Sequence, residues 1–197
     1  MSGMYPLIVV GSGEATAHQP SLFEAKIRST VRYADPAAWI TANAVKFALA
    51  GAEDLLADWR HEIGIVTIGD QGPGTSMAKV QADGETGFSS PLHYAASSPG
   101  TLVGVPCIAF GLRGPTMNLT MAPQDGLPVA LMLCEGWLKR KAARLMIVAT
   151  CQTASLGATL SRAALIAPQG FIGTDRPLTD SFSLWMAGGD PAEGASA

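Results

Sequence analysis

Short apolar runs alternate along the sequence with longer stretches of helical character. Four runs, each bounded by glycine, proline, charged or polar residues, predict β-strands at residues 5–10, 64–69, 116–121 and 145–149. Longer stretches of good helix formers predict helices at residues 37–56, 128–141 and 154–166. This alternation predicts an α/β fold, with a mixed sheet that is covered by helices.

Several boundaries carry their own signals. Asp35 and Pro36 form an N-cap followed by a proline at the first helical position, which starts the helix at 37–56. Residues 102–110 predict either a helix or another buried segment, and the sequence leaves this open. Residues 81–99 are rich in turn formers and predict little regular structure.

The C-terminal part has weaker patterning. After Pro168 we expect irregular structure, with residues 182–186 as an edge strand. Residues 188–197 are small and polar, which predicts a disordered tail. Because no linker or repeat divides the chain, residues 1–187 are predicted to form one domain.

Composition restricts the classes of partner. The 197 residues are 48% hydrophobic and only 15% charged, with a net charge of -3. Because average domains are about 25% charged, some apolar surface is expected to be covered by a protein partner. The slight acidic excess makes nucleic acid and anionic membranes poor partners.

The cysteines and the N-terminus indicate a compartment. Cys107, Cys134 and Cys151 are odd in number, widely spaced and set among apolar residues. This pattern predicts free, buried thiols in a reducing compartment, and we therefore expect a cytoplasmic protein. The N-terminus lacks the features of a signal peptide, and no apolar run approaches the roughly 18 residues that span a bilayer.

Glycine-rich turns and histidines offer weak signals for cofactors or metals. The segment from Gly11 to Thr16 lacks the third glycine of a dinucleotide site, and Thr75 occupies the lysine position of a phosphate loop. The three histidines have no ligand spacing among themselves or with the cysteines, so we expect neither a metal nor a cofactor. Cys151, which follows a buried strand, is a candidate nucleophile if His93 or His18 folds beside it, and the alternative is a structural thiol.

The segment 89–153 contains the most specific pattern. It runs from Ser89-Ser-Pro through Gly111-Leu-Arg-Gly-Pro115 to a strand, a turn ending at Gly126, a helix and a buried strand. This order and spacing resemble the N-terminal half of a β-ketoacyl synthase of the thiolase-like family. The resemblance implies a thiolase-like fold reduced to a single αβ repeat.

One position departs from the family pattern. In ketosynthases the nucleophilic cysteine lies nine residues after the glycine of Gly-Pro and three before a small residue. Counting from Gly114 gives Pro123, with Gly126 as the small residue. A proline accepts no acyl group, so the resemblance implies the fold without thioester chemistry. The chain therefore resembles a chain-length factor, in which glutamine usually replaces the cysteine, and a shift of one residue would place Gln124 there.

Chain-length factors pair with an active ketosynthase in polyketide, aryl-polyene or fatty-acid-type elongation. The resemblance implies that residues 116–121 pair with the ketosynthase and that neighbouring side chains line the acyl tunnel or dimer interface. These are Met117, Leu119, Met121, Pro123, Gln124 and Gly126. For an acidic acyl carrier protein, the candidate contacts are Arg113, Lys139, Arg140 and Arg144.

Simpler interpretations of both sets stay open. The tunnel residues also fit the core of a single-domain sheet, and the basic residues also fit a solvated helix end. Two other classes of function compete with a non-catalytic subunit. One is a divergent acyl-transfer or acyl-thioester-processing enzyme that uses Cys151 or a histidine, and the other is a module that binds an acyl carrier or a small ligand.

Overall fold

The computed structural model describes residues 6–153, 158–171, 178 and 180–188. In it a mixed sheet has the strand order β1-β5-β4-β2-β3. The strands are β1 (Leu7–Ala15), β2 (Ile63–Gly69), β3 (Thr116–Leu119), β4 (Leu145–Thr153) and β5 (Thr159–Pro168). Strands β3, β2 and β4 are parallel, whereas β5 pairs antiparallel with both β4 and β1.

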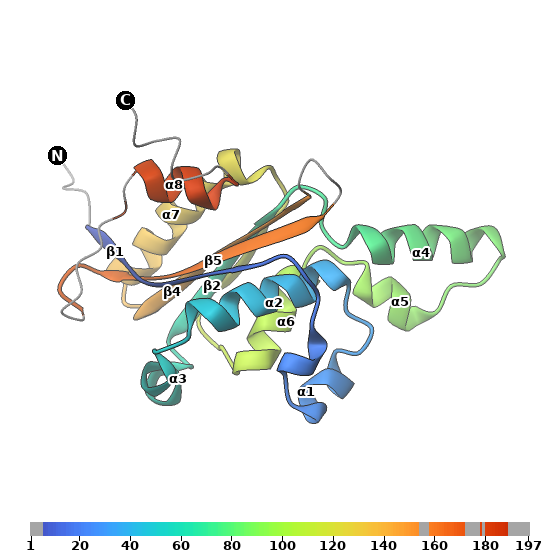
Figure 1. Ribbon diagram of the computed structural model, residues 1–197, viewed down its shortest axis with the longest axis horizontal. Coiled ribbons are helices and arrows are strands. Elements are labelled where there is room, and N and C mark those ends of the chain that lie inside the picture. Colours follow the sequence, from blue (N-terminus) through green and yellow to red (C-terminus); the bar gives the residue numbers. More distant parts are fainter. Residues whose placement is uncertain (1–5, 154–157, 172–177, 179, 189–197) are drawn as a thin grey trace.

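Helices cover both faces of this sheet (Figure 1). On one face, α2 (Pro36–Ala48) and α6 (Thr101–Phe110) pack against Ile65, Ile147 and Leu165. On the other, α7 (Pro123–Lys139) and α8 (Asp180–Met186) pack against Val66, Val148 and Ile166. Since successive side chains of a strand point to opposite faces, the β-branched runs fill two cores at once. The predicted mixed sheet covered by helices is confirmed.

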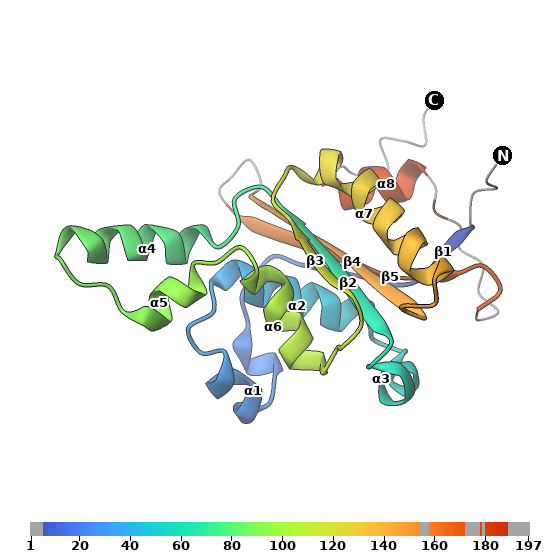
Figure 2. The same ribbon diagram turned by 180° about the vertical axis from the view of Figure 1, so that it is seen from behind.

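The remaining helices lie around this body. They are η1 (Pro20–Leu22), α1 (Ala25–Thr30), α3 (Glu53–Trp59), α4 (Gly74–Glu85) and α5 (Pro91–Ala96). Helices α4 and α5 pack on each other and project beyond the sheet as an arm (Figures 1 and 2). Residues 81–99 were predicted to have little regular structure. This prediction is wrong for the residues of this range that belong to α4 and α5.

The N-terminal glycines serve packing. Strand β1 crosses α2 so closely that a Cβ atom on Gly13 would lie 2.4 Å from the carbonyl oxygen of Ala44. A Cβ atom on Gly11 would lie 2.2 Å from the carbonyl oxygen of Ala48. Since real Cβ atoms do not approach backbone oxygens this closely, only glycine fits at these two positions. The close packing of β1 on α2 therefore explains why both positions are glycine, and no nucleotide-binding role is needed to explain them.

Two assignments in the C-terminal part were wrong. The helix expected at 154–166 is instead strand β5 over its described part, and residues 154–157 lie outside the described residues. Its small and apolar residues, such as Ala163 and Ile166, are buried on both faces, so helical propensity is overridden by sheet pairing. The edge strand expected at 182–186 is helix α8, which buries Met186.

Helix boundaries also differ from the predictions. The helix expected at 37–56 is divided, because Gly51 adopts a φ of 82° between α2 and α3. Residues 102–110 resolve as a helix, with Pro106 inside it. Helix α7 begins at Pro123 rather than at Pro128. The tail expected to be disordered lies, from residue 189 onward, outside the described residues.

Candidate functional site

The strand at one end of the sheet has an open side. In the described part of the chain, β3 pairs with a single strand, β2, in a register that joins Thr116 to Ile65 and Leu119 to Ile68. Met117 is 40% exposed on it, whereas Leu119 is half-buried against the core under α7. Figure 2 shows β3 at this edge, with α7 on one side of it and α6 on the other. An exposed edge strand presents unpaired backbone groups with which a strand of another chain can pair.

A sharp turn leads from β3 into α7. The helix begins at Pro123, whose ring suits the first helical turn because that position needs no backbone N–H. Pro123 is buried and offers neither a thiol nor a hydroxyl, while Gln124 beside it is exposed. The position that the family pattern assigns to the nucleophile therefore lies at the start of a helix without a reactive group.

Gly126 allows the helix to approach the sheet closely. A Cβ atom at this position would lie 2.5 Å from the Cγ2 atom of Ile68 and 3.0 Å from Cγ of Met121. Gly126 is buried, and Met121 lies over it with 36% of its surface exposed. The small residue expected three positions after the nucleophile position thus has a packing role in this chain.

A polar cavity of about 280 Å³ lies at the carboxyl ends of β2 and β4. The buried Asp35 carboxylate at its wall accepts hydrogen bonds from the backbone N–H of Ala37 (2.8 Å) and from that of Ser76 (2.6 Å). Because these donors belong to the first turns of α2 and α4, one carboxylate ties the starts of both helices together. Cys151 and Gln152 also line this cavity.

The Cys151 thiol has an environment that keeps it neutral. It is buried, its sulfur lies 4.0 Å from the carbonyl oxygen of Ala37, and its pKa is raised to about 11, chiefly by desolvation. Asp35 and Asp70 add a smaller upward effect on this pKa, because a thiolate would repel their carboxylates. A catalytic thiol needs the opposite, a lowered pKa.

The histidines lie elsewhere. His93 Nδ1 lies 3.3 Å from an oxygen of Asp83, and its ring packs edge-on against Tyr33. His18 and His61 are exposed. Among the described residues that line the cavity beside Cys151 there is no histidine, so the structure does not bring together the pair that the sequence offered as an alternative.

All three cysteines are expected to react slowly with alkylating agents. Burial raises the pKa of Cys107 to about 11 and that of Cys134 to about 12, as it does for Cys151. Since the thiolate is the reactive form, iodoacetamide at pH 8 should alkylate Cys151 at least tenfold more slowly in the folded protein than in urea. Peptide mass spectrometry over time measures both rates. Rapid labelling of folded Cys151 at pH 7 would favour the enzyme alternative instead.

The four basic candidates gather at the far end of α7. Arg113 and Arg144 flank the start of β2, where their backbone N–H groups donate to the carbonyl oxygens of Arg60 and Glu62. Arg144 also donates to the Glu62 carboxylate at 2.7 Å, and Lys139 pairs with Glu135. A helix of 17 residues is about 25 Å long, so these residues lie far from Pro123.

The described residues contain no cluster of histidine, cysteine and acidic side chains that could hold a metal ion. None of the helices in the described part of the chain is both long and apolar enough to cross a membrane.

Proteins similar to this chain are found among solved structures. No family model and no curated protein matches the sequence. The ishigamide ketosynthase/chain length factor matches with a TM-score of 0.65 and 14% identity, over 88% of this chain and 64% of that one. A beta-ketoacyl synthase from Burkholderia phymatum STM815 matches with a TM-score of 0.65 and 13% identity, over 84% and 59%. This chain thus spans less than two thirds of either.

A third match covers both chains almost fully. It is to a structure of the ketosynthase ApeO in complex with its chain length factor ApeC, from Xenorhabdus doucetiae. The TM-score is 0.58 at 14% identity, over 94% of this chain and 93% of that one. The resemblance inferred from the motifs is confirmed at the level of the fold: this chain has the thiolase-like fold of the ketosynthases and chain-length factors.

Proposed function

We propose that this chain is a non-catalytic, chain-length-factor-like subunit that pairs with an active ketosynthase. The observation that carries the proposal is the turn after β3, where a buried proline occupies the position that the family pattern assigns to the nucleophile. A helix that starts there retains the architecture of a ketosynthase and lacks the group that would hold an acyl chain. The Cys151 thiol is neutral, and the described residues that line its cavity include no histidine, which supports the same conclusion.

The open side of β3 supports pairing with a partner. Exposed Met117 and Met121 lie on or next to this strand, and methionine packs adaptably against varied apolar surfaces. A partner strand added along β3 would continue the sheet and cover both side chains. We propose that Met117, Leu119, Met121 and Gln124 then lie at the interface or beside the acyl tunnel, with Pro123 and Gly126 positioning the helix behind them.

The acyl chain, in this proposal, is held by the ketosynthase during polyketide, aryl-polyene or fatty-acid-type elongation. Arg113, Lys139, Arg140 and Arg144 are all exposed and are proposed as a contact for an acidic acyl carrier protein. Their position at the far end of α7 separates such a contact from the tunnel residues. A carrier bound there would be attracted by charge, so its affinity should fall with added salt.

Co-expression tests the proposal directly. We expect this chain to purify in a one-to-one complex with one of the ketosynthases encoded in the source genome, as read by native mass spectrometry. The same chain expressed alone is the control, and it should self-associate weakly at high protein concentration because its edge strand is uncovered. If the chain is stable alone and binds none of these ketosynthases, the proposal is wrong, and labelling of Cys151 by an acyl-thioester analogue becomes the next test.

A further inference from the structure

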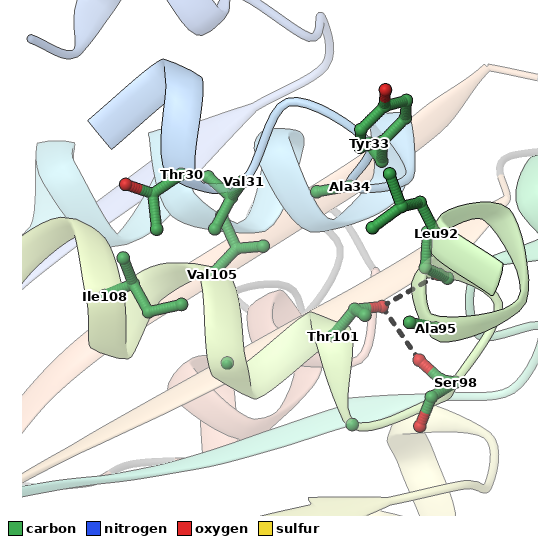
Figure 3. A pocket seen from close by; sticks show the side chains of 13 residues that line it. Thr30, Val31, Tyr33, Ala34, Leu92, Ala95, Ser98, Thr101, Val105 and Ile108 are labelled. Atoms are coloured by element: carbon green, nitrogen blue, oxygen red, sulfur yellow. Dashed lines mark hydrogen bonds between the residues drawn. The ribbon is translucent and has the colours of Figure 1, made fainter. Parts of the chain in front are cut away.

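An apolar groove of about 360 Å³ lies between α1, α5 and α6 (Figure 3). Its walls are aliphatic side chains, among them Val31, Leu92 and Ile108. The Thr101 hydroxyl within it already donates to the carbonyl oxygen of Ser98 at 2.8 Å. None of the described lining residues is charged. The described lining is uncharged and mostly apolar, with hydroxyl groups at Thr30, Tyr33, Ser98 and Thr101, so the groove fits an apolar occupant better than a charged one.

Small residues make the groove deep enough to receive a side chain. Gly100 and Gly104 of the α6 region and Ala95 of α5 line it, and a Cβ atom added at Gly104 would have no neighbour within 4 Å. At the rim, Leu92 is 50% exposed and Ile108 is 48% exposed. Exposed apolar side chains around a concave apolar surface are typical of a site that another molecule covers.

Helix α6 connects the groove with the open edge of the sheet. Helix α6, which forms one wall, packs against both β2 and β3. Figure 2 shows α5, α6 and β3 on the same side of the molecule. Continuing outward along the arm, Tyr94 and Phe88 are strongly exposed. A partner that pairs along β3 could therefore also contact α6 and the groove beside it.

The size of a stable interface requires such an extension. Strand β3 has four residues, which span about 13 Å at about 3.3 Å per residue. Stable protein complexes bury about 800 Å² on each partner, contributed by roughly 20–30 residues. Pairing along the four residues of β3 alone would bury far less surface than a stable complex needs, so the interface must continue over neighbouring elements. The groove is the adjoining concave apolar surface on the α6 side.

We propose that this groove receives apolar side chains of the ketosynthase subunit that pairs along β3. The inference rests on the proposed function and adds a second contact region, formed by α5 and α6, to the edge strand. Apolar side chains that fill a pocket at the centre of an interface contribute much of its affinity. The groove should therefore determine which ketosynthase is accepted, because its shape must match the inserted side chains.

A larger side chain on α6 that fills the groove tests the proposal. Gly104→Leu places a side chain in the open space above α6, and leucine favours the helix more than glycine does. We expect the dissociation constant of the complex with the ketosynthase to rise at least tenfold, measured by isothermal titration calorimetry. Thermal unfolding of the chain should show that the variant is folded. Ile108→Asp, which charges the exposed rim, should weaken the complex similarly.

Two controls separate the groove from general effects. Gly104→Ala changes the same backbone position with one methyl group and should alter the dissociation constant by less than about threefold. Ala57→Leu adds the apolar mass at an exposed position of α3, outside the groove, and should have no effect. If Gly104→Leu and Ile108→Asp bind like the wild type, the inference is wrong while the proposed function stands.

Other occupants give different results, and each would overturn the inference. If the groove variants change the oligomeric state of the chain alone, by native mass spectrometry, the occupant is a second copy of this chain. If they change the length of the product while the affinity stays constant, the occupant is the acyl chain. If the wild-type chain binds no ketosynthase at all, the proposed function itself fails.

Discussion

Replacing Met117 with lysine is expected to raise the dissociation constant of the ketosynthase complex at least a hundredfold. Met117 lies on the open edge strand β3, with 40% of its surface exposed in the isolated chain. A lysine on an edge strand opposes pairing, because its ammonium group would lose water on entering an apolar interface. A hundredfold change corresponds to about 2.7 kcal/mol, which is the effect of removing a central interface side chain.

The same substitution should leave the isolated chain folded. A lysine at an exposed edge keeps its charge in water, so we expect thermal unfolding close to that of the wild type. Phe47→Lys is the matched control, because Phe47 is 45% exposed on α2, which packs under the opposite strands β1 and β5. Both variants are compared by titration calorimetry against the same ketosynthase. Equal affinities for Met117→Lys and wild type would exclude β3 from the interface.

Gly126→Val is expected to destabilise the chain itself, by about 2–3 kcal/mol. A Cβ atom here would lie 2.5 Å from Cγ2 of Ile68, so the helix must move away from β2 or Ile68 must leave its rotamer. Both responses open the core between α7 and the sheet, where Leu127 and Ala130 are also buried. Urea unfolding followed by circular dichroism measures the loss.

A glycine on the same helix provides the comparison. At Gly136 the nearest atoms to an added Cβ belong to the Arg140 guanidinium group, at 3.4 Å and beyond, and this flexible side chain can move. Gly136→Ala should therefore stabilise the helix by about 0.5–1 kcal/mol. If Gly126→Val unfolds at the same urea concentration as the wild type, the close approach of α7 to β2 is not needed for folding.

Strong local patterns determined much of the fold. The buried β-branched runs predicted β2 and β4, and the Asp35-Pro36 pair predicted the start of α2, where Asp35 indeed caps the backbone N–H of Ala37. The spacing from Gly114 to Gly126 indicated the turn between β3 and α7 and the family resemblance with it. These features depend on neighbours in sequence, so composition and spacing are sufficient to detect them.

Short apolar segments without periodicity were assigned wrongly. In β5 the run around Ala163 and Leu165 has high helical propensity, and only its position between β1 and β4 makes it a strand. In α8 the five residues from 182 to 186 are too few for a period to be read, and packing against α7 makes them helical. In both cases the partner elements lie far away in the sequence, and the burial they provide outweighs local preference.

The α/β fold class could be predicted from the sequence alone, and the family resemblance assigned Pro123 to the nucleophile position, with the candidate residues around it. Which of these surfaces are open depends on how the chain folds in three dimensions. Among the described residues, no strand pairs with the outer side of β3, Cys151 and His93 contact different groups, and α1, α5 and α6 together form an apolar groove. Exposure and cavity shape arise from contacts between segments distant in the chain, and spacing along the sequence carries no record of those contacts.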